Sequence, residues 1–219
     1  GKIPVMVNWT VGPRHINSVI EATGMEVCLS SWAFLDRLSN VDLGKLVDHL
    51  VEIEDMRDSI TLKDKLKALM LSKQSVQALI DRYKLHEKSV EETAVLLFTS
   101  GSEGAPKGVP LSHRNIMSNL DGVIRSVDIL ERDVFLSILP PFHSFGFTIC
   151  GMAPMLLGVK AVYYPNPTEG AKLARAAERW KATILCGAPS FLKNIFKSAE
   201  EKQLQSLRLV VTGAEKAPE

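Results

Sequence analysis

The sequence predicts an α/β fold in which a largely parallel, doubly wound sheet is flanked by helices. Strand-like and helix-like segments alternate regularly from residue 93 to the end of the chain. The strand-like segments are short, continuous apolar runs, such as residues 94–98, and such runs are typical of strands that are buried on both faces. A glycine-rich loop follows that run directly, at the end of a strand where open α/β sheets bind their ligands.

The expected elements before residue 93 are shorter and less regular. A helix is predicted at residues 14–23 and ends at Gly24, because glycine readily adopts the left-handed conformation that closes a helix. Apolar residues recur at helical spacing from Leu62 to Tyr83, which predicts one amphipathic helix with a solvated polar face. Residues 47–53 fit either a helix or a strand. The other elements expected here are strands at 5–9 and 26–29 and a helix at 32–38.

In the regular part, Ser112 is a suitable N-cap for a helix at residues 113–127. The strands expected after it are 134–139, 160–164, 183–186 and 207–211, and the helices are 145–157, 169–180 and 190–198. Residues 134–159 carry no formal charge if His143 is neutral, and they are long enough to span a membrane. Pro140 and Pro141 would break a helix there, so we expect a buried strand, a sharp loop and a buried helix instead.

The composition fits one large domain or two small ones with a sizeable core, since 46% of the 219 residues are hydrophobic. Lys and Arg total 26 and Asp and Glu total 25, which argues against a nucleic-acid partner because such proteins concentrate basic charge on one face. The cysteines Cys28, Cys150 and Cys186 lack metal-ligand spacing, so we expect reduced, mostly buried thiols and no metal site formed by them. The first residues lack a Met and already read as interior strand, and the last follow directly on a strand-like run and a glycine, so both ends look cut from a longer protein.

The loop at residues 99–108 has the chemistry of a phosphate-binding loop. Its three glycines let the main chain approach a ligand closely, and successive backbone N–H groups in such a turn form an anion-binding concavity. Thr99, Ser100 and Ser102 add hydroxyl donors, and Lys107 adds a mobile positive charge. The spacing is neither that of a Walker loop nor that of a dinucleotide fingerprint, and an ordinary glycine-containing surface loop is the alternative.

Three blocks of the sequence resemble the adenylate-forming superfamily, which includes acyl-CoA synthetases, luciferases and peptide-synthetase adenylation domains. The first is the loop at 98–109 with His113 and Asn115, the second is the aromatic–His block at 139–146, and the third is the block at 210–216. Residues 4–12, the Ser102–Glu103 pair and the final Gly-Ala-Glu-Lys are most similar to the synthetase half of bacterial acyl–acyl-carrier-protein synthetase / 2-acylglycerophosphoethanolamine acyltransferases. On this resemblance, residues 1–219 are part of the N-terminal ATP- and acyl-binding domain, and the mobile C-terminal domain lies outside them.

The resemblance implies ATP with Mg²⁺ and a two-step reaction. A carboxylate attacks the α-phosphate of ATP to give an acyl-adenylate and pyrophosphate, and a thiol then takes the acyl group. The residues implied at the β- and γ-phosphates are Thr99, Ser100, Gly101, Ser102, Gly104 and Lys107. Glu103 stands where the family usually has threonine, and it either points away from the phosphates or engages Mg²⁺.

The same resemblance assigns catalytic roles to Lys107 and His143. His143 is placed near the reacting carboxylate or at the mouth of an acyl tunnel, against the alternative of a structural histidine. Gly213 and Ala214, with Glu215 beside them, are placed by the acyl chain or the adenine. The aromatic residues that either line an acyl pocket or belong to the core are Phe142, Phe145 and Phe147.

The expected partners are a fatty acid and, through the full-length enzyme, acyl carrier protein or CoA, with no nucleic acid. Membrane association is expected only through absent parts of the parent protein, which would be cytoplasmic or lie at the cytoplasmic face of the inner membrane. None of the five histidines is followed five residues later by Asp, so the acyltransferase motif is not in this chain. The family's later motifs are also missing, so we expect no detectable adenylation by these residues alone. Two alternatives stay open: a fatty-acyl-CoA ligase or other AMP-forming ligase, and a non-catalytic nucleotide-binding module.

Overall fold

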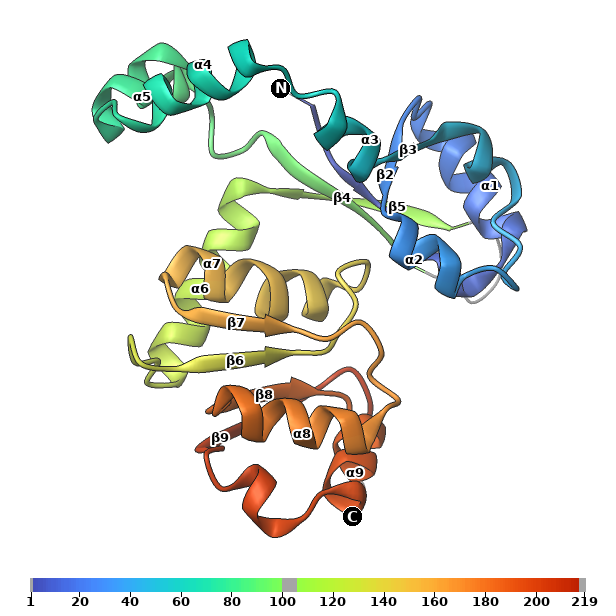
Figure 1. The fold of residues 1–219 in the computed structure, drawn as a ribbon, viewed down its shortest axis with the longest axis vertical. Helices are drawn as coiled ribbons and strands as arrows, with labels where there is room; N and C mark the ends of the chain where they lie inside the picture. The colour runs from blue at the N-terminus through green and yellow to red at the C-terminus, as the bar shows by residue number, and fades with distance from the viewer. Residues whose placement is uncertain (1, 100–105, 217–219) are drawn as a thin grey trace. The chain divides into compact units, whose positions relative to one another are not determined.

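The computed structural model describes residues 2–99 and 106–216 (Figure 1). The chain forms two compact units. The first comprises residues 1–6, 95–97 and 110–219, and the second comprises residues 7–94 and 98–109. Among the described residues, no helix combines the length and the apolar character that crossing a bilayer requires.

The first unit is built on a four-stranded parallel sheet, with the strands in the order β7-β6-β8-β9. In this register Leu136 pairs with Val162 on one side and with Leu185 on the other. The sheet confirms the predicted parallel topology, since every strand is reached through a helical crossover. The strands are β6 (Val134–Ser137), β7 (Lys160–Tyr163), β8 (Ile184–Gly187) and β9 (Leu209–Thr212).

Helices cover both faces of this sheet, as the doubly wound fold requires. Leu136 and Leu185 pack with residues of α8 (Gly170–Trp180) and α9 (Pro189–Ser198) in one buried cluster. Their neighbours Phe135 and Ile184 belong to a second cluster with residues of the π-helix η4 (Gly146–Met152) and α6 (His113–Ser126). Successive strand residues point to opposite faces, so the two clusters form the two layers of core. The remaining helices of the unit are α7 (Ala153–Leu157) and η5 (Glu201–Leu204).

A three-stranded sheet in the order β1-β4-β5 contains the strand that precedes the glycine-rich loop. β1 (Val5–Met6) runs parallel to β4 (Thr93–Thr99), with Val5 opposite Leu96. The consecutive residues Leu97 and Phe98 are both buried, which confirms the prediction of a strand covered on both faces. β5 (Lys107–Ser112) is a strand that the sequence did not predict, because only a long strand-to-helix turn was expected there.

The second unit is mainly helical and has its own core, in which Ile16 and Ile20 of α1 pack against Leu46 of η2. β2 and β3 form a short parallel pair. Gly24 has φ +59° and closes α1 as predicted. The elements of this unit are η1 (Trp9–Val11), α1 (Pro13–Thr23), β2 (Cys28–Ser30), α2 (Trp32–Arg37), η2 (Gly44–His49), β3 (Leu50–Glu52), α3 (Ile53–Asp58), α4 (Leu62–Ser72), α5 (Val76–Arg82) and η3 (Leu85–Glu87).

Two expected elements differ from the structure, and one ambiguous segment is resolved by it. The single helix predicted from Leu62 to Tyr83 is two helices, because the Ser75 hydroxyl accepts a hydrogen bond from the backbone N–H of Ala78 and so begins a new helix. The ambiguous residues 47–53 are the end of η2, the strand β3 and the first residue of α3. The helix predicted at 145–157 is a π-helix followed by a short α-helix.

Candidate active site

Two predicted phosphate-binding residues lie at the described edges of the glycine-rich loop. Thr99 ends β4 and Lys107 begins β5, and both are exposed residues of the second unit. The Thr99 hydroxyl donates a hydrogen bond of 3.5 Å to the Lys107 carbonyl oxygen, which joins the two edges of the loop. The predicted residues Ser100, Gly101, Ser102, Glu103 and Gly104 lie outside the described residues, and their roles stay predictions.

Ser112 and Asn115, which follow the loop, cap the N-terminus of α6 by hydrogen bonds to each other. The Ser112 side chain accepts from the backbone N–H of Asn115 at 3.2 Å, and the Asn115 side chain accepts from the backbone N–H of Ser112 at 2.9 Å. Two of the helix's N-terminal donors are thereby satisfied. Asn115 of the first sequence block therefore has a local structural role, which fixes where α6 begins after the loop.

A sharp turn holds the backbone of His143. The His143 N–H donates to the Pro140 carbonyl at 3.2 Å, and the His143 carbonyl accepts from the N–H of Phe147 at 2.7 Å. A Cβ placed on Gly146 would lie only 2.1 Å from the Pro140 carbonyl oxygen, so the turn and the start of η4 approach at a distance that only glycine permits. π-helical turns are uncommon in proteins, and many of those that occur lie at functional sites. His143 lies shortly before such a helix, and its role stays a prediction.

His143 is an exposed residue whose imidazole lies against the ring of the buried Phe142, with the two ring centroids 4.9 Å apart. Burial lowers the pKa of His143 below its ordinary value, because the charged imidazolium loses hydration there. The lowered pKa favours the neutral ring, in which one nitrogen can donate a hydrogen bond and the other can accept one. Such a group can orient a carboxylate without adding a charge.

Gly213 and Ala214 follow β9 in the first unit. A Cβ on Gly213 would lie 3.5 Å from the Phe145 ring, so the predicted Gly-Ala segment and the aromatic–His block come together in the structure. Ala214 has φ +70°, in the left-handed region that few residues other than glycine adopt. Glu215 lies at the start of α9, where its carboxylate accepts from the backbone N–H and the hydroxyl of Ser190 at 3.2 and 2.9 Å.

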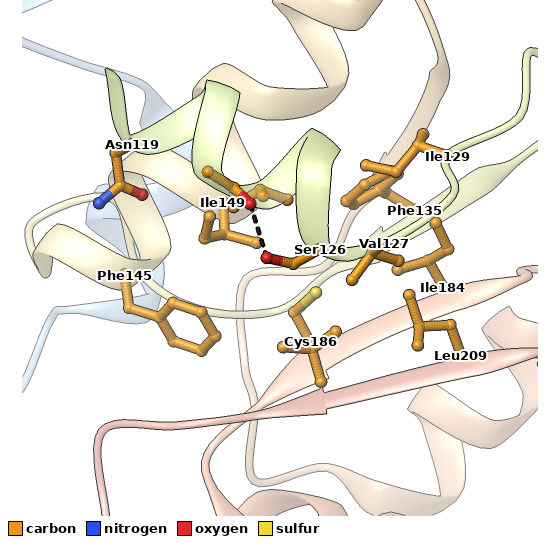
Figure 2. Close-up of a pocket in the computed structure, with 13 residues that line it drawn as sticks. Asn119, Ser126, Val127, Ile129, Phe135, Phe145, Ile149, Ile184, Cys186 and Leu209 are labelled. Atoms are coloured by element: carbon orange, nitrogen blue, oxygen red, sulfur yellow. Dashed lines mark hydrogen bonds between the residues drawn. The ribbon is translucent and has the colours of Figure 1, made fainter. Parts of the chain in front are cut away.

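An apolar cavity of about 430 Å³ adjoins these residues within the first unit (Figure 2). This volume is within the range of roughly 300–1,000 Å³ that is usual for small-molecule sites. Phe145 and Val211 line the cavity, so it borders both the aromatic–His block and the strand that leads to Gly213. The lining residues are Asn119, Gly122, Val123, Ser126, Val127, Ile129, Phe135, Phe145, Ile149, Ile184, Cys186, Leu209 and Val211.

The sequence did not single out the α6 side of this cavity. Asn119, Gly122, Val123 and Ser126 recur at helical spacing and could be recognised as one face, but nothing in the pattern separates a cavity wall from core. Of the predicted aromatic residues, Phe145 lines the cavity, while Phe142 and Phe147 are buried and are not among its lining residues. Cys150 and Cys186 are buried free thiols, as expected, and Cys28 is half-buried.

Within the described part of the chain, no three His, Cys, Asp or Glu side chains gather closely enough to hold a metal ion. Mg²⁺ in nucleotide-dependent enzymes is usually held by substrate phosphates with one or two carboxylates, so a preformed protein cluster is not needed for it. Glu103, the carboxylate that the sequence places near the phosphates, is outside the described residues.

A protein-family model described as "AMP-binding enzyme" matches residues 1–219. Among curated proteins, 4-coumarate–CoA ligase 2 of Oryza sativa subsp. japonica is 27% identical over 231 residues, which cover 98% of this chain and 39% of that protein. The medium-chain fatty-acid–CoA ligase of Escherichia coli (strain K12) is 34% identical over 130 residues, which cover 58% of this chain and 23% of that protein. The chain therefore spans well under half the length of these relatives.

Solved structures of similar fold include the o-succinylbenzoate CoA synthetase of Bacillus subtilis in complex with ATP and magnesium ion. It has a TM-score of 0.72 and 17% identity, over 99% of this chain and 40% of that one. A fatty acyl-adenylate ligase from L. pneumophila, in complex with acyl adenylate and pyrophosphate, has a TM-score of 0.69 and 21% identity, over 100% of this chain and 37% of that one. At these identities the similarity establishes the α/β fold.

Proposed function

The chain belongs to the AMP-binding enzyme family, and from that membership we propose that it supplies the ATP- and acid-binding part of an acid–thiol ligase. The carboxylate of the acid attacks the α-phosphorus of ATP, the bond to the β-phosphate oxygen breaks, and pyrophosphate leaves. A thiolate then attacks the carbonyl carbon of the acyl-adenylate, and AMP leaves. Relatives that are acid–CoA ligases support this reaction class.

The observation that carries the proposal is the apolar cavity that Phe145 of the aromatic–His block and Val211 line. Its walls are almost entirely apolar, and its borders include Phe145 and the strand before Gly213. An apolar acid would place its chain in the cavity and its carboxylate toward the polar turn at His143, because burying the chain releases about 25 cal/mol per Å². We therefore propose a fatty acid as substrate, as the medium-chain fatty-acid relative also suggests.

His143 and Lys107 would then act on different parts of the reaction. A neutral imidazole can orient the attacking carboxylate and leaves it a better nucleophile than an imidazolium would, since a full positive charge would stabilise the unreacted carboxylate. Lys107, with Thr99 and the loop residues 100–104, would bind the β- and γ-phosphates and neutralise charge on the leaving pyrophosphate. Mg²⁺ would enter with ATP and neutralise further phosphate charge.

The finer proposal concerns the thiol. We propose the phosphopantetheine of a carrier protein as acceptor, because Ser102–Glu103 and the final Gly-Ala-Glu-Lys resemble that branch of the family, whose parent protein also carries an acyltransferase half. CoA is the alternative, and the ligases among the relatives favour it. The two acceptors are distinguished by measuring acyl transfer to carrier protein and to CoA with a ligase of full length that contains this chain.

The test is acid-dependent exchange of pyrophosphate into ATP, measured on that full-length ligase with straight-chain acids of increasing length. We expect exchange with apolar acids and about a hundredfold loss in Lys107→Ala, the cost typical of removing one such charged donor. Arg125→Ala, which removes an exposed cation from α6, is the matched control and should retain exchange. ATP binding without any acid-dependent exchange would instead favour the non-catalytic nucleotide-binding module.

A further inference from the structure

Helices α4 and α5, at the upper left of Figure 1, expose an unusual amount of apolar surface in the second unit. No residue of either helix is buried. Large apolar side chains that are more than half exposed recur over this short segment, whereas such residues are normally scattered singly. We call this set the α4–α5 surface: Leu62, Leu66, Leu69, Met70, Val76, Tyr83 and Leu85.

On α4 the exposed apolar residues share one face. Leu62, Leu66 and Leu69 are spaced four and then three residues apart, and Met70 extends the same stripe. Helical spacing places Leu71 on the side of α4 opposite to this stripe. Leu71 is half-buried, as are Leu79 and Ile80 of α5. The helices thus bury part of their apolar residues locally, and a continuous stripe on α4 faces solvent.

The charges around this stripe are predominantly positive. The exposed lysines Lys63, Lys65, Lys67 and Lys73 lie on or beside α4, where Asp64 is the acidic residue, and over α5 and η3 Arg82 and Lys84 are matched by Asp81 and Glu87. The Asp64 carboxylate is engaged at the start of its own helix, where it accepts hydrogen bonds from the backbone N–H and the hydroxyl of Thr61 at 3.0 and 2.6 Å. The surface therefore combines apolar side chains with a net positive flank.

We propose that the α4–α5 surface docks on a lipid bilayer that contains anionic headgroups. A helix with an apolar stripe bordered by lysines lies in the plane of such an interface, with the apolar side chains at the acyl boundary and the ammonium groups at the headgroups. The 11 residues of α4 are too few to span a bilayer, which takes about 20, so the helix lies on the membrane. A second copy is a poorer occupant because it would bring the same lysines against these.

This proposal differs from the expectation that membrane association comes only through parts outside these residues. It assigns a membrane contact to the described residues themselves, and it does not depend on the reaction proposed above. Its electrostatic component predicts a marked dependence on salt, since exposed charges are screened beyond about 8 Å at physiological ionic strength.

The test places an environment-sensitive fluorophore at a single residue of the full-length protein, so that any other membrane-binding part does not affect the readout. One protein carries the label on Met70→Cys, and the matched control carries it on Met155→Cys, which replaces an exposed methionine of α7. With phosphatidylcholine–phosphatidylglycerol vesicles we expect a blue shift, and quenching by a lipid-borne quencher, at 70 and not at 155. Phosphatidylcholine vesicles alone should give a much smaller change.

Two variants separate the two parts of the surface. Combining Leu66→Glu with Met70→Glu should abolish the vesicle response of a label at Val76, and Lys63→Gln with Lys65→Gln should weaken vesicle affinity by on the order of tenfold. These residues are exposed, so the unfolding temperature should not change. An unchanged label at 70 would overturn the proposal, as would a label that is already shielded without lipid, because another segment or a second copy would then cover the surface.

Discussion

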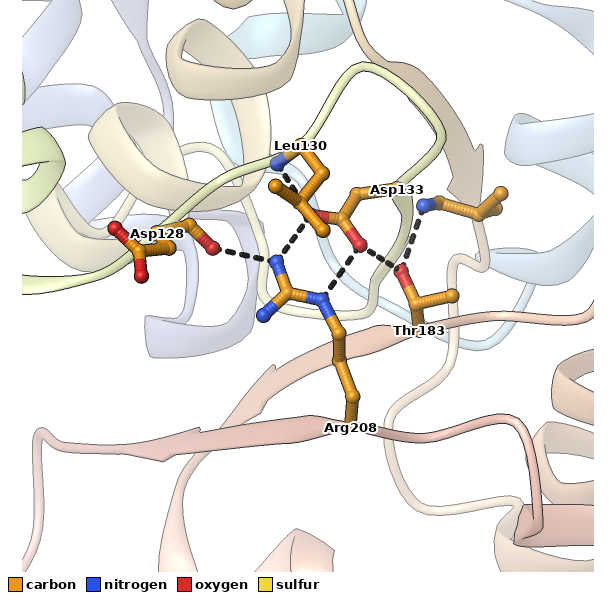
Figure 3. A network of polar contacts seen from close by, with 6 residues as sticks. Asp128, Leu130, Asp133, Thr183 and Arg208 are labelled. Carbon is orange, nitrogen blue, oxygen red and sulfur yellow. Dashed lines mark hydrogen bonds and ion pairs between the residues drawn. The ribbon is translucent and has the colours of Figure 1, made fainter.

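Asp133 and Arg208, which lie 75 residues apart in the chain, form a two-pronged ion pair (Figure 3). Arg208 Nε donates to Asp133 Oδ1 at 2.8 Å, and Nη2 pairs with Oδ2. The carboxylate also accepts from the Thr183 hydroxyl and from the backbone N–H of Leu130, both at 2.7 Å. The Asp133 side chain is 1% exposed, so one buried carboxylate joins the segments that lead into β6, β8 and β9.

The first prediction is that Asp133→Asn destabilises the protein by about 2 kcal/mol, because the buried side chain loses its charge-assisted hydrogen bonds with Arg208. The measurement is the free energy of unfolding in urea. Asp121→Asn is the matched control, since Asp121 forms an equally short but exposed ion pair with Arg125 and its loss should cost less than about 0.5 kcal/mol. Similar losses of unfolding free energy in the two variants would contradict a stabilising role for the Asp133–Arg208 ion pair.

The second prediction is that the stabilisation by the Asp133–Arg208 ion pair depends on pH. Arg208, with the Leu130 N–H and the Thr183 hydroxyl, holds the pKa of Asp133 well below its usual range. Because the folded-state pKa is below the unfolded value of about 4, the stabilisation is complete above pH 4 and is lost as pH falls toward the folded-state pKa. The stability difference between the parent and Asp133→Asn should therefore be constant from pH 5 to 7 and shrink below pH 4. A difference that does not change with pH would contradict this account.

The third prediction concerns Gly146, whose replacement by alanine should destabilise the protein by about 3 kcal/mol. The added Cβ would meet the Pro140 carbonyl oxygen, a backbone atom that cannot rotate away, so the turn that holds His143 must shift. Acid-dependent pyrophosphate exchange should fall in the same variant. The control is Gly151→Ala in the same helix, where the nearest atom to the new Cβ is 3.6 Å away and the change should be neutral or stabilising.

Much of the fold could be predicted from the sequence because the signals are local. The Ser112 cap, the Gly24 stop and the apolar run that ends in Leu97 and Phe98 each depend on the residues at that point of the chain. The break after Lys73 was missed because continuous apolar spacing hides a single capping hydroxyl at Ser75. Helix propensity alone does not indicate which serine will cap.

The site was only partly predictable, because its walls come from distant segments. Gly213 and Phe145 were expected in separate motifs, and only the tertiary structure shows that they meet. The α6 wall of the cavity and the Asp133–Arg208 pair had no signal in one sequence, since a buried carboxylate and a surface carboxylate look alike there.

The fourth prediction is that Val211→Phe shortens the preferred acid. Val211 lines the cavity, so a larger side chain would occupy volume that a substrate chain would otherwise fill. Each methylene excluded is worth roughly 1 kcal/mol, so kcat/KM for the longest acid should fall at least tenfold relative to the shortest. Val210→Phe is the control, because Val210 precedes Val211 on β9, points to the opposite side of the sheet and does not line the cavity. Parallel changes for all acids would contradict the assignment.

The fifth prediction separates two roles for Glu215, which was expected at the nucleotide and which the structure places against Ser190. If the contact is a helix cap, Glu215→Gln should cost about 1 kcal/mol of unfolding free energy, because it removes the negative charge that accepts from the Ser190 N–H at the start of α9. Ser190→Ala removes only the hydroxyl donor and keeps the N–H, so it should cost less. The double variant should cost less than the sum of the two, since both weaken one contact. Calorimetric ATP titration decides the other role: a binding residue would weaken affinity in Glu215→Gln alone, whereas a cap would leave ATP affinity the same in both single variants.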